Sequence, residues 1–402
     1  MRIVSKLLVG VTAAAAITAL AATPALADPP AGKTPRPTDV VGVGSDTIQN
    51  VMDQLSVAYN ATHATGKLYS FDATNPTNGA MGDPIQLKSG SSTCNLPRPD
   101  GSSAGINALT TMNGTTTGSQ PCINFARSSR ARSSTDPNTI SFITLGGDAV
   151  SVATQPGSHA PANGITTSVL TGIYNCTITK WNQIPGNSGG ASSTIVPMLP
   201  QNGSGTRSFF LGAIGLGTGT SGPGACVSTS DTAQGTGHLG DNTLQENQGV
   251  APSLNTNKAN VIFPFSVAKY IAEKFHSASC GTISACNSAP NNCHPTGTQN
   301  KFGCNTHGTM NLSRINNTAP TVGSGGNTKV NPKFTAAFTR FVFDVVENPP
   351  GVTTPVVPPA MAKYFGPTGF TCTNTTAKND LKKYGFLVLP PGTTAGHCGA
   401  AS

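Results

Sequence analysis

A strand, a tight turn and a helix follow one another twice in this chain, and this order constrains the fold more than any other feature. Residues 40–44 read Val-Val-Gly-Val-Gly, polar residues follow at 45–47, and apolar residues are then spaced for one helix face over 48–58. The same order returns over 195–214, where the turn is rich in glycine and hydroxyl side chains. Strands that alternate with helices predict an α/β layered fold.

Two further strands are expected, and the chain is long enough for two domains. Residues 140–153 and 341–346 are nearly continuous apolar runs, the first interrupted at Gly146-Gly147. We expect a two-lobed α/β fold with mixed sheets and a hinge. The expected limits are a disordered lead-in at 28–35, a first lobe over 36–148 and 336–402, and a second lobe over 149–335 with a cysteine-rich insertion at 280–304.

The first 27 residues are typical of a secretory signal. Arg2 and Lys6 precede an apolar run over 7–20, and small residues follow up to Ala27, where cleavage is expected. The run is shorter than the roughly 20 apolar residues that a membrane-spanning helix needs; a buried N-terminal helix is the alternative. Asp28 rather than a cysteine would then begin the mature chain, which favours secretion or association with the cell wall over a lipid anchor.

Charged side chains are few and scattered along the sequence. They make up 10% of the residues, and 24 Lys and Arg, two of them in the signal, stand against 16 Asp and Glu. A nucleic-acid-binding protein presents a clustered basic face, so no nucleic-acid partner is expected. A mild positive excess suits a small anionic ligand.

Ten cysteines, an even number in a chain with an export signal, predict disulfides. Nearness in sequence favours Cys94–Cys122, Cys176–Cys226, Cys372–Cys398 and two pairs among Cys280, Cys286, Cys293 and Cys304, although spacing does not determine connectivity. The alternative is a zinc site formed by Cys293, His294, Cys304 and His307. The chain has no Cys-x-x-Cys pair, and an oxidising compartment disfavours free thiolates. We therefore expect neither a metal nor a cofactor.

Four polar turns carry the candidate ligand-binding residues. Glycine lets the backbone approach a ligand, hydroxyl groups and the free N–H groups at a helix start donate to anions, and guanidinium groups bind oxyanions in a bidentate manner. The candidates are Ser45, Asp46 and Thr47; Ser102; Arg127, Ser128, Ser129 and Arg130; and Gly203, Ser204, Gly205, Thr206 and Arg207. Each turn also has a plainer interpretation as a helix cap or a solvated basic loop.

The order of these turns resembles that of PstS-like substrate-binding proteins of bacterial phosphate ABC transporters. Residues 42–47 are similar to the family's first glycine-rich turn, 101–109 to its second turn and helix, and 143–156 to the segment that crosses into its second lobe. The most specific element lies within 170–182, where Leu-Thr-Gly-Ile-Tyr is followed by Ile-Thr-Lys-Trp-Asn. The Gly-Ser-Gly-Thr turn at 203–206 follows at the expected distance.

The resemblance implies phosphate buried between two lobes, in a secreted, disulfide-containing variant of actinobacterial type. The residues then expected to donate to phosphate oxygens are Ser102, Ser204, Gly205 and Thr206, together with Asp46 and Thr47. The family's acidic residue falls near Ser129 and its arginine on Pro200. Because a buried dianion without a cation is costly, the expected replacements for the arginine are Arg127, Arg130 and Arg207. Asp46 is the expected replacement for the acidic residue.

These features predict a monomeric, exported solute-binding protein that captures phosphate or a similar oxyanion for an ABC permease, and not an enzyme. One alternative is a secreted or surface interaction protein that keeps the scaffold without binding an anion. Another is a serine hydrolase that uses Ser188 and His397, but their order differs from that of trypsin-like chains and the flanks of Ser188 suggest a loop. Two-metal hydrolysis would need clustered acids, whereas here the acids are dispersed.

Overall fold

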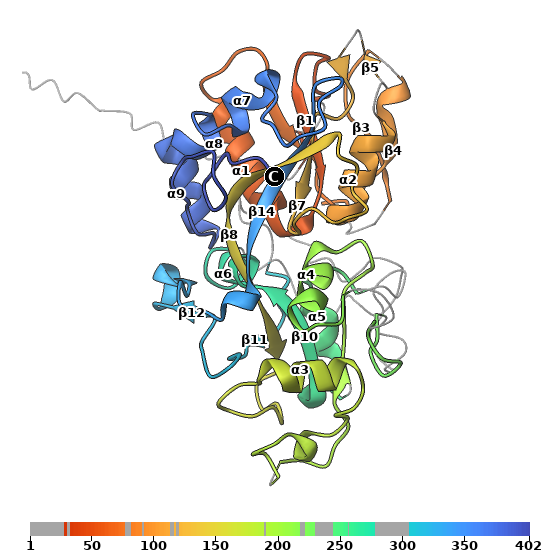
Figure 1. The fold of residues 1–402 in the computed structure, drawn as a ribbon, viewed down its shortest axis with the longest axis vertical. Helices are drawn as coiled ribbons and strands as arrows, with labels where there is room; N and C mark the ends of the chain where they lie inside the picture. The colour runs from red at the N-terminus through yellow and green to blue at the C-terminus, as the bar shows by residue number, and fades with distance from the viewer. Residues whose placement is uncertain are drawn as a thin grey trace, which may run out of the picture.

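Two long antiparallel strands, β8 (Ile140–Thr154) and β14 (Thr339–Glu347), run from one lobe of the protein into the other (Figure 1). Every residue of β8 is buried. The computed structural model describes residues 28–29, 33–76, 82–90, 92–112, 116–117, 120–188, 190–217, 222–229, 244–255, 257–277 and 305–402. The main sheet has the strand order β2 (Leu68–Ser70), β1 (Val40–Gly44), β7 (Phe125–Ser128), β14, β8, β10 (Val261–Ser266) and β9 (Val196–Pro197), and β11 (Asn311–Leu312) also pairs with β8.

The upper lobe in Figure 1 contains the end of the main sheet formed by β2, β1 and β7. Strand β1 (Val40–Gly44) is parallel to both β2 (Leu68–Ser70) and β7 (Phe125–Ser128), and β14 pairs with β7 in the antiparallel direction. The helices of this lobe are α1 (Gln49–Asn60), α2 (Ser102–Thr111), α7 (Pro359–Phe365), α8 (Phe370–Thr373) and α9 (Thr375–Lys383). The chain therefore returns to this lobe at its C-terminal end.

The lower lobe is built on the second half of β8. Strand β10 (Val261–Ser266) pairs antiparallel with β8 and parallel with β9 (Val196–Pro197), while β11 (Asn311–Leu312) pairs antiparallel with β8. The helices here are α3 (Thr167–Tyr174), α4 (Gly205–Ala213), α5 (Val250–Leu254) and α6 (Val267–Phe275). The expectation of a two-lobed α/β fold with a mixed sheet is thus confirmed.

Three two-stranded sheets complete the strands of the described residues. They are β3 (Pro84–Gln86) with β4 (Asn95–Pro97), β5 (Thr116–Thr117) with β6 (Gln120–Pro121), and β12 (Thr321–Val322) with β13 (Lys329–Val330). Within the segment expected to be a disordered lead-in, the carboxylate of Asp28 pairs with the guanidinium of Arg98 at 2.8 Å. The carbonyl of Pro35 accepts a hydrogen bond from the Ser89 N–H at 2.8 Å.

The expected interruption of a strand at Gly146-Gly147 is wrong, because β8 runs through both residues. The missing side chains instead make room for the C-terminal segment: Gly147 exchanges two backbone hydrogen bonds with Leu387, at 2.9 and 2.8 Å. A Cβ atom at Gly147 would lie 3.1 Å from the Leu387 Cβ. The glycines therefore allow a close crossing of two chain segments and do not end the strand.

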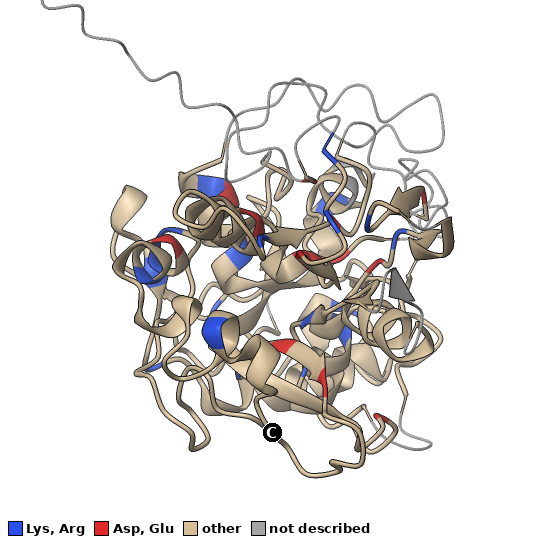
Figure 2. Ribbon diagram, turned by 90° about the horizontal axis from the view of Figure 1, so that it is seen from above, with Lys and Arg blue, Asp and Glu red and all other residues tan. Residues whose placement is uncertain are grey.

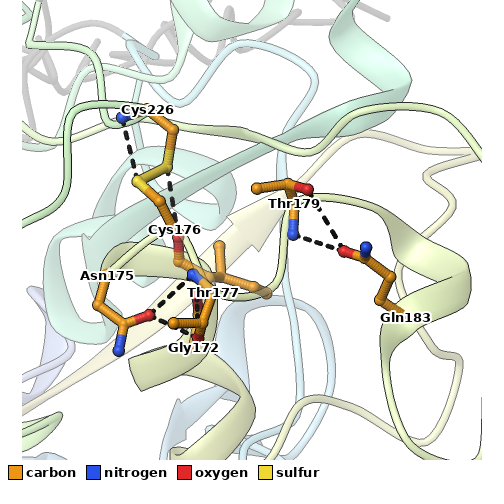
Figure 3. Close-up of a disulfide and its surroundings, with 8 residues drawn as sticks. Gly172, Asn175, Cys176, Thr177, Thr179, Gln183 and Cys226 are labelled. Atoms are coloured by element: carbon orange, nitrogen blue, oxygen red, sulfur yellow. Dashed lines mark hydrogen bonds between the residues drawn. A yellow bond between two sulfur atoms is a disulfide. The ribbon is translucent and has the colours of Figure 1, made fainter.

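Three of the expected disulfides are present: Cys94–Cys122, Cys176–Cys226 and Cys372–Cys398. Cys176, two residues after the end of α3, has a φ of 69°, and its disulfide joins this end of the helix to the segment after α4 (Figure 3). Beside it, the Gln183 side chain accepts a 2.8 Å hydrogen bond from the Thr179 N–H. The pairs expected among Cys280, Cys286, Cys293 and Cys304 lie outside the described residues.

Figure 2 shows the Lys, Arg, Asp and Glu positions scattered along the ribbon, with no separate grouping of the basic ones in this view. This agrees with the expectation from the sequence that charges are dispersed. Among the described helices, none has the length and apolar composition needed to cross a membrane.

Candidate functional site

Five buried hydroxyl side chains, drawn from all four predicted turns, lie between the two lobes. They are Ser45, Thr47, Ser102, Ser129 and Thr206, and we call them the hydroxyl cluster. The Ser129 Oγ lies 3.1 Å from the Ser45 Oγ and 3.2 Å from the Ser102 Oγ. The Thr47 and Thr206 hydroxyls lie 3.4 Å apart, and this contact joins the upper lobe to the lower lobe.

The carboxylate of Glu246 lies within the hydroxyl cluster. Its Oε1 accepts hydrogen bonds from the hydroxyls of Thr47 at 2.6 Å, Thr206 at 2.6 Å and Ser129 at 3.0 Å. It also accepts one from the Thr206 backbone N–H at 3.2 Å. Hydrogen bonds to an ionised acceptor are stronger than those between neutral groups. The cluster is therefore built to stabilise a negatively charged oxygen.

The start of α4 explains why a backbone donor is available at this point. Ser204 is the N-cap, and its side chain accepts the Arg207 N–H at 3.0 Å. The Thr206 N–H has no partner within the helix and points to Glu246. The helix dipole adds a partial positive charge at this end, which favours an anion.

Two glycines allow the lobes to approach closely. A Cβ at Gly205 would lie 2.3 Å from the Ser102 Oγ and 2.4 Å from the Ser129 Oγ, much closer than atoms can pack. Gly101 has a φ of 98°, and a Cβ there would lie 2.5 Å from the carbonyl oxygen of Gly203. The Ser103 N–H donates to that same oxygen at 3.2 Å. Glycine is thus required on both sides of this contact between the lobes.

Arg340 on β14 brings a buried positive charge to the hydroxyl cluster. Its Nη2 donates to the Thr206 hydroxyl at 3.0 Å and its Nη1 to the Ser129 carbonyl at 2.8 Å. The same guanidinium pairs with Asp148 through Nε at 3.0 Å and Nη2 at 2.8 Å. Asp148 also accepts the Ala268 N–H near the start of α6 at 3.0 Å. One ion pair therefore connects β14, β8 and α6 with the candidate site.

Arg127 lies behind the first turn. It is buried, and it donates to the carbonyls of Ser45 at 3.0 Å and Gly44 at 2.7 Å. The carboxyl groups of Asp53 and Asp344 interact with its charge, and burial raises the pKa of each to about 8 against the opposing effect of Arg127. Arg127 thus supports the turn through its backbone.

Arg130, Ser128 and Arg207 also make contacts with protein groups. Arg130 forms a bidentate pair with Asp136 at 2.7 and 2.9 Å; burial opposes ionisation there, but the hydrogen bond from Arg130 holds the pKa of Asp136 below its ordinary value. The Ser128 hydroxyl donates to the Arg130 carbonyl at 2.7 Å. Arg207 reaches back to the carbonyl of Pro200 at 2.9 Å.

Asp46 lies next to the cluster and beside a buried lysine. The Lys269 Nζ is 3.6 Å from one of its carboxylate oxygens, and the Asn247 side chain donates to the other at 3.1 Å. Burial raises the pKa of Asp46, while the charge of Lys269 acts in the opposite direction. Lys269 also lies 3.8 Å from Glu273, whose pKa burial raises to about 8.

The sequence had assigned no role to three residues at this site: Glu246, Arg340 and Asp148. Glu246 lies in a stretch that reads as a glycine- and hydroxyl-rich loop, where an isolated acid among so few charges was the one available signal. Arg340 and Asp148 lie on β14 and β8, and a charged residue within an apolar strand was the corresponding signal.

Among the described residues, those of the two alternative chemistries make no hydrogen bond to the hydroxyl cluster. Ser188 is in an exposed turn after α3, and the His397 ring contacts the Thr394 hydroxyl at 3.0 Å. Of the four residues considered for zinc, only His307 is described; its ring stacks on Tyr270 with centroids 5.1 Å apart. The described part of the chain holds no group of three or more His, Cys, Asp or Glu residues that could hold a metal ion.

Comparison with known proteins gives one family match and several similar structures. The model of the PBP superfamily domain matches residues 29–262. A phosphate-bound crystal structure from Clostridium perfringens is 13% identical with a TM-score of 0.49, covering 87% of this chain and 99% of that one. An ABC-type phosphate transport receptor from Vibrio cholerae is 17% identical, with a TM-score of 0.47 and coverage of 87% and 99%. PstS from Borrelia burgdorferi is 16% identical, with a TM-score of 0.40 and coverage of 87% and 98%. A search among curated proteins gives no match.

Proposed function

This chain belongs to the PBP superfamily, and on that premise we propose that it is an exported solute-binding protein that captures phosphate or a similar tetrahedral oxyanion. The ligand would lie in the hydroxyl cluster between the lobes, and the closed protein would deliver it to an ABC permease. The proposal includes a signal cleaved after Ala27, a monomer, and lobes over 36–148 with 336–402 and over 149–335.

The observation that carries the proposal is the convergence of donors on one anionic oxygen. Three hydroxyls and one backbone N–H, from both lobes, donate to the Glu246 carboxylate at 2.6–3.2 Å. Of the candidates from the sequence, Thr47, Ser129 and Thr206 donate directly, and Ser45 and Ser102 contact Ser129. We assign the supporting positive charge to Arg340, because its guanidinium contacts both Ser129 and Thr206.

Isothermal titration of the mature protein with phosphate, sulfate and a neutral sugar tests this function. The expected result is saturable phosphate binding at roughly micromolar affinity or tighter, near −8 kcal/mol, and no binding of the sugar. Failure of phosphate and sulfate to bind, either to the wild type or to a variant that lacks the Glu246 carboxylate, would favour the interaction-protein alternative.

A further inference from the structure

The carboxylate of Glu246 lies where we propose that the oxyanion binds, and it accepts the hydrogen bonds that the oxyanion would accept. Its Oε1 receives donors of the upper lobe, Thr47 at 2.6 Å and Ser129 at 3.0 Å. It also receives the hydroxyl and the backbone N–H of Thr206 from the lower lobe, at 2.6 and 3.2 Å. A carboxylate of the chain itself therefore joins the two lobes through the same donors that the proposed function assigns to the ligand.

The residue after Glu246 fixes the direction of this side chain. Asn247 has a φ of 59°, a left-handed conformation that asparagine tolerates better than most residues. Its side chain donates to the Thr47 hydroxyl at 3.0 Å and accepts the Ser266 N–H at 2.9 Å. The turn at 246–247 is thus attached to both lobes, so the carboxylate is aimed into the cluster by local structure.

The carboxylate of Glu246 makes hydrogen bonds in this site through only one of its two oxygens. Its second oxygen, Oε2, is buried and has no hydrogen-bond partner within the described residues. A tetrahedral oxyanion has additional oxygens, so it would distribute the same donors over several acceptors. Glu246 Oε1 already takes these donors, and an oxyanion with no proton to share with the carboxylate would be strongly repelled by it in a buried site. An incoming oxyanion therefore requires Glu246 to withdraw.

On the basis of the proposed function, we propose that Glu246 is a tethered competitor of the oxyanion. In the ligand-free protein its carboxylate bridges the lobes and keeps the cleft closed. When the oxyanion binds, Glu246 leaves the hydroxyl cluster and the ligand takes over its hydrogen bonds. The affinity of the wild type is then reduced by the fraction of molecules in which Glu246 occupies the site.

Titration calorimetry of Glu246→Ala with phosphate and with sulfate tests this competition. Both anions should bind the variant about tenfold or more tightly than the wild type, as expected where a competitor occupies nine-tenths or more of the sites. Glu246→Gln, which keeps the size of the side chain but lacks its charge, should also bind both anions more tightly than the wild type. Glu347→Ala is the matched control, because Glu347 lies at the far end of β14, where it pairs with Ile140, and should bind like the wild type.

Two binding results would contradict the proposal that Glu246 competes with the oxyanion. Weaker phosphate binding by Glu246→Ala together with stronger sulfate binding would identify Glu246 as an acceptor for the ligand's proton, and unchanged binding of both anions would show that it does not compete. If no protein binds either anion, the proposed function is wrong. Small-angle X-ray scattering without ligand then still tests the bridge: Glu246→Ala should have a larger radius of gyration than the wild type, and an equal radius would refute it.

Discussion

At the scale of single residues, Arg340 occupies its position because a guanidinium can make several directed contacts at once. It donates to Ser129, Thr206 and Asp148, all at 3.0 Å or less. Its side chain is 2% exposed, and that of Asp148 is 0% exposed. Removing either partner would leave an uncompensated buried charge, so this pair must be altered conservatively in any test of the site.

We predict that Arg340→Lys weakens phosphate binding about tenfold to a hundredfold. Lysine keeps the charge but cannot reproduce the planar set of donors, and a hydrogen bond to a charged group contributes roughly 1.5–3 kcal/mol. Titration calorimetry measures the change, and Arg314→Lys at an exposed loop position is the control. Equal affinity of Arg340→Lys and wild type would exclude Arg340 as the supporting cation.

Asp344 gives a pH dependence of stability whose sign follows from its surroundings. Asp344 lies opposite Arg127 in the register of β14 with β7. Both of its carboxylate oxygens are buried without a hydrogen-bond partner among the described residues. Burial raises its pKa to about 8, while Arg127 acts in the opposite direction. The folded state therefore keeps a proton that the unfolded state loses above about pH 4. The stabilisation that comes from keeping this proton on Asp344 is fully present below about pH 4 and is lost as the pH rises through about 8.

We predict that Asp344→Asn becomes more stable relative to the wild type as the pH rises from 4 to 8. The difference in the free energy of unfolding should grow by at most about 1.4 kcal/mol per pH unit. Urea denaturation of both proteins at several pH values measures it. Asp136→Asn should show the opposite sign, because the pKa of Asp136 is held low and its stabilisation is present at neutral pH and lost on acidification. A difference for Asp344→Asn that is independent of pH would contradict the assignment.

At the scale of elements, the start of α4 can approach the hydroxyl cluster only because Gly205 has no side chain. We predict that Gly205→Ala weakens anion binding by at least tenfold while α4 still forms, because alanine favours a helix but its Cβ would displace the hydroxyls of Ser102 and Ser129. Calorimetry and circular dichroism separate the two effects. Gly212→Ala in the same helix is the control, since a Cβ there meets nothing within 4 Å. Similar affinities for the two variants would show that the lobes need not approach so closely.

The elements that the sequence could predict are those with a local signature. The turns at 45–47 and 203–206 precede helices within a few residues, so their hydroxyl groups were identifiable as candidates. Arg340 and Ser129 are 211 residues apart, and their contact depends on the register that pairs Arg340 with Asp148. Neither spacing nor composition reveals such a register. The sequence also predicts an interruption at the glycines of β8 that the structure does not have, because the segment that crosses them at Leu387 is distant in sequence.

At the scale of the whole molecule, one of the three clusters of buried apolar side chains in the described residues extends through both lobes. One cluster of buried side chains includes Ile48 and Phe125 of the upper lobe, Leu170 and Phe210 of the lower lobe, and Val342 of the strand that passes between them. A hydrophobic cluster that continues through β8 and β14 couples the lobes in unfolding, although the proposed binding site lies at their junction. The protein is thus expected to lose both lobes together and not one before the other.

We therefore predict a single calorimetric unfolding transition in the absence of ligand. Phosphate at about a hundred times its dissociation constant should stabilise the folded protein by about 2.7 kcal/mol without splitting the transition, because the ligand binds only when both lobes are folded. Scanning calorimetry over a series of phosphate concentrations measures this, with the neutral sugar as the control. Two transitions, only one of which moves with phosphate, would show that the anion is held by a single lobe and that the shared hydrophobic cluster does not couple them.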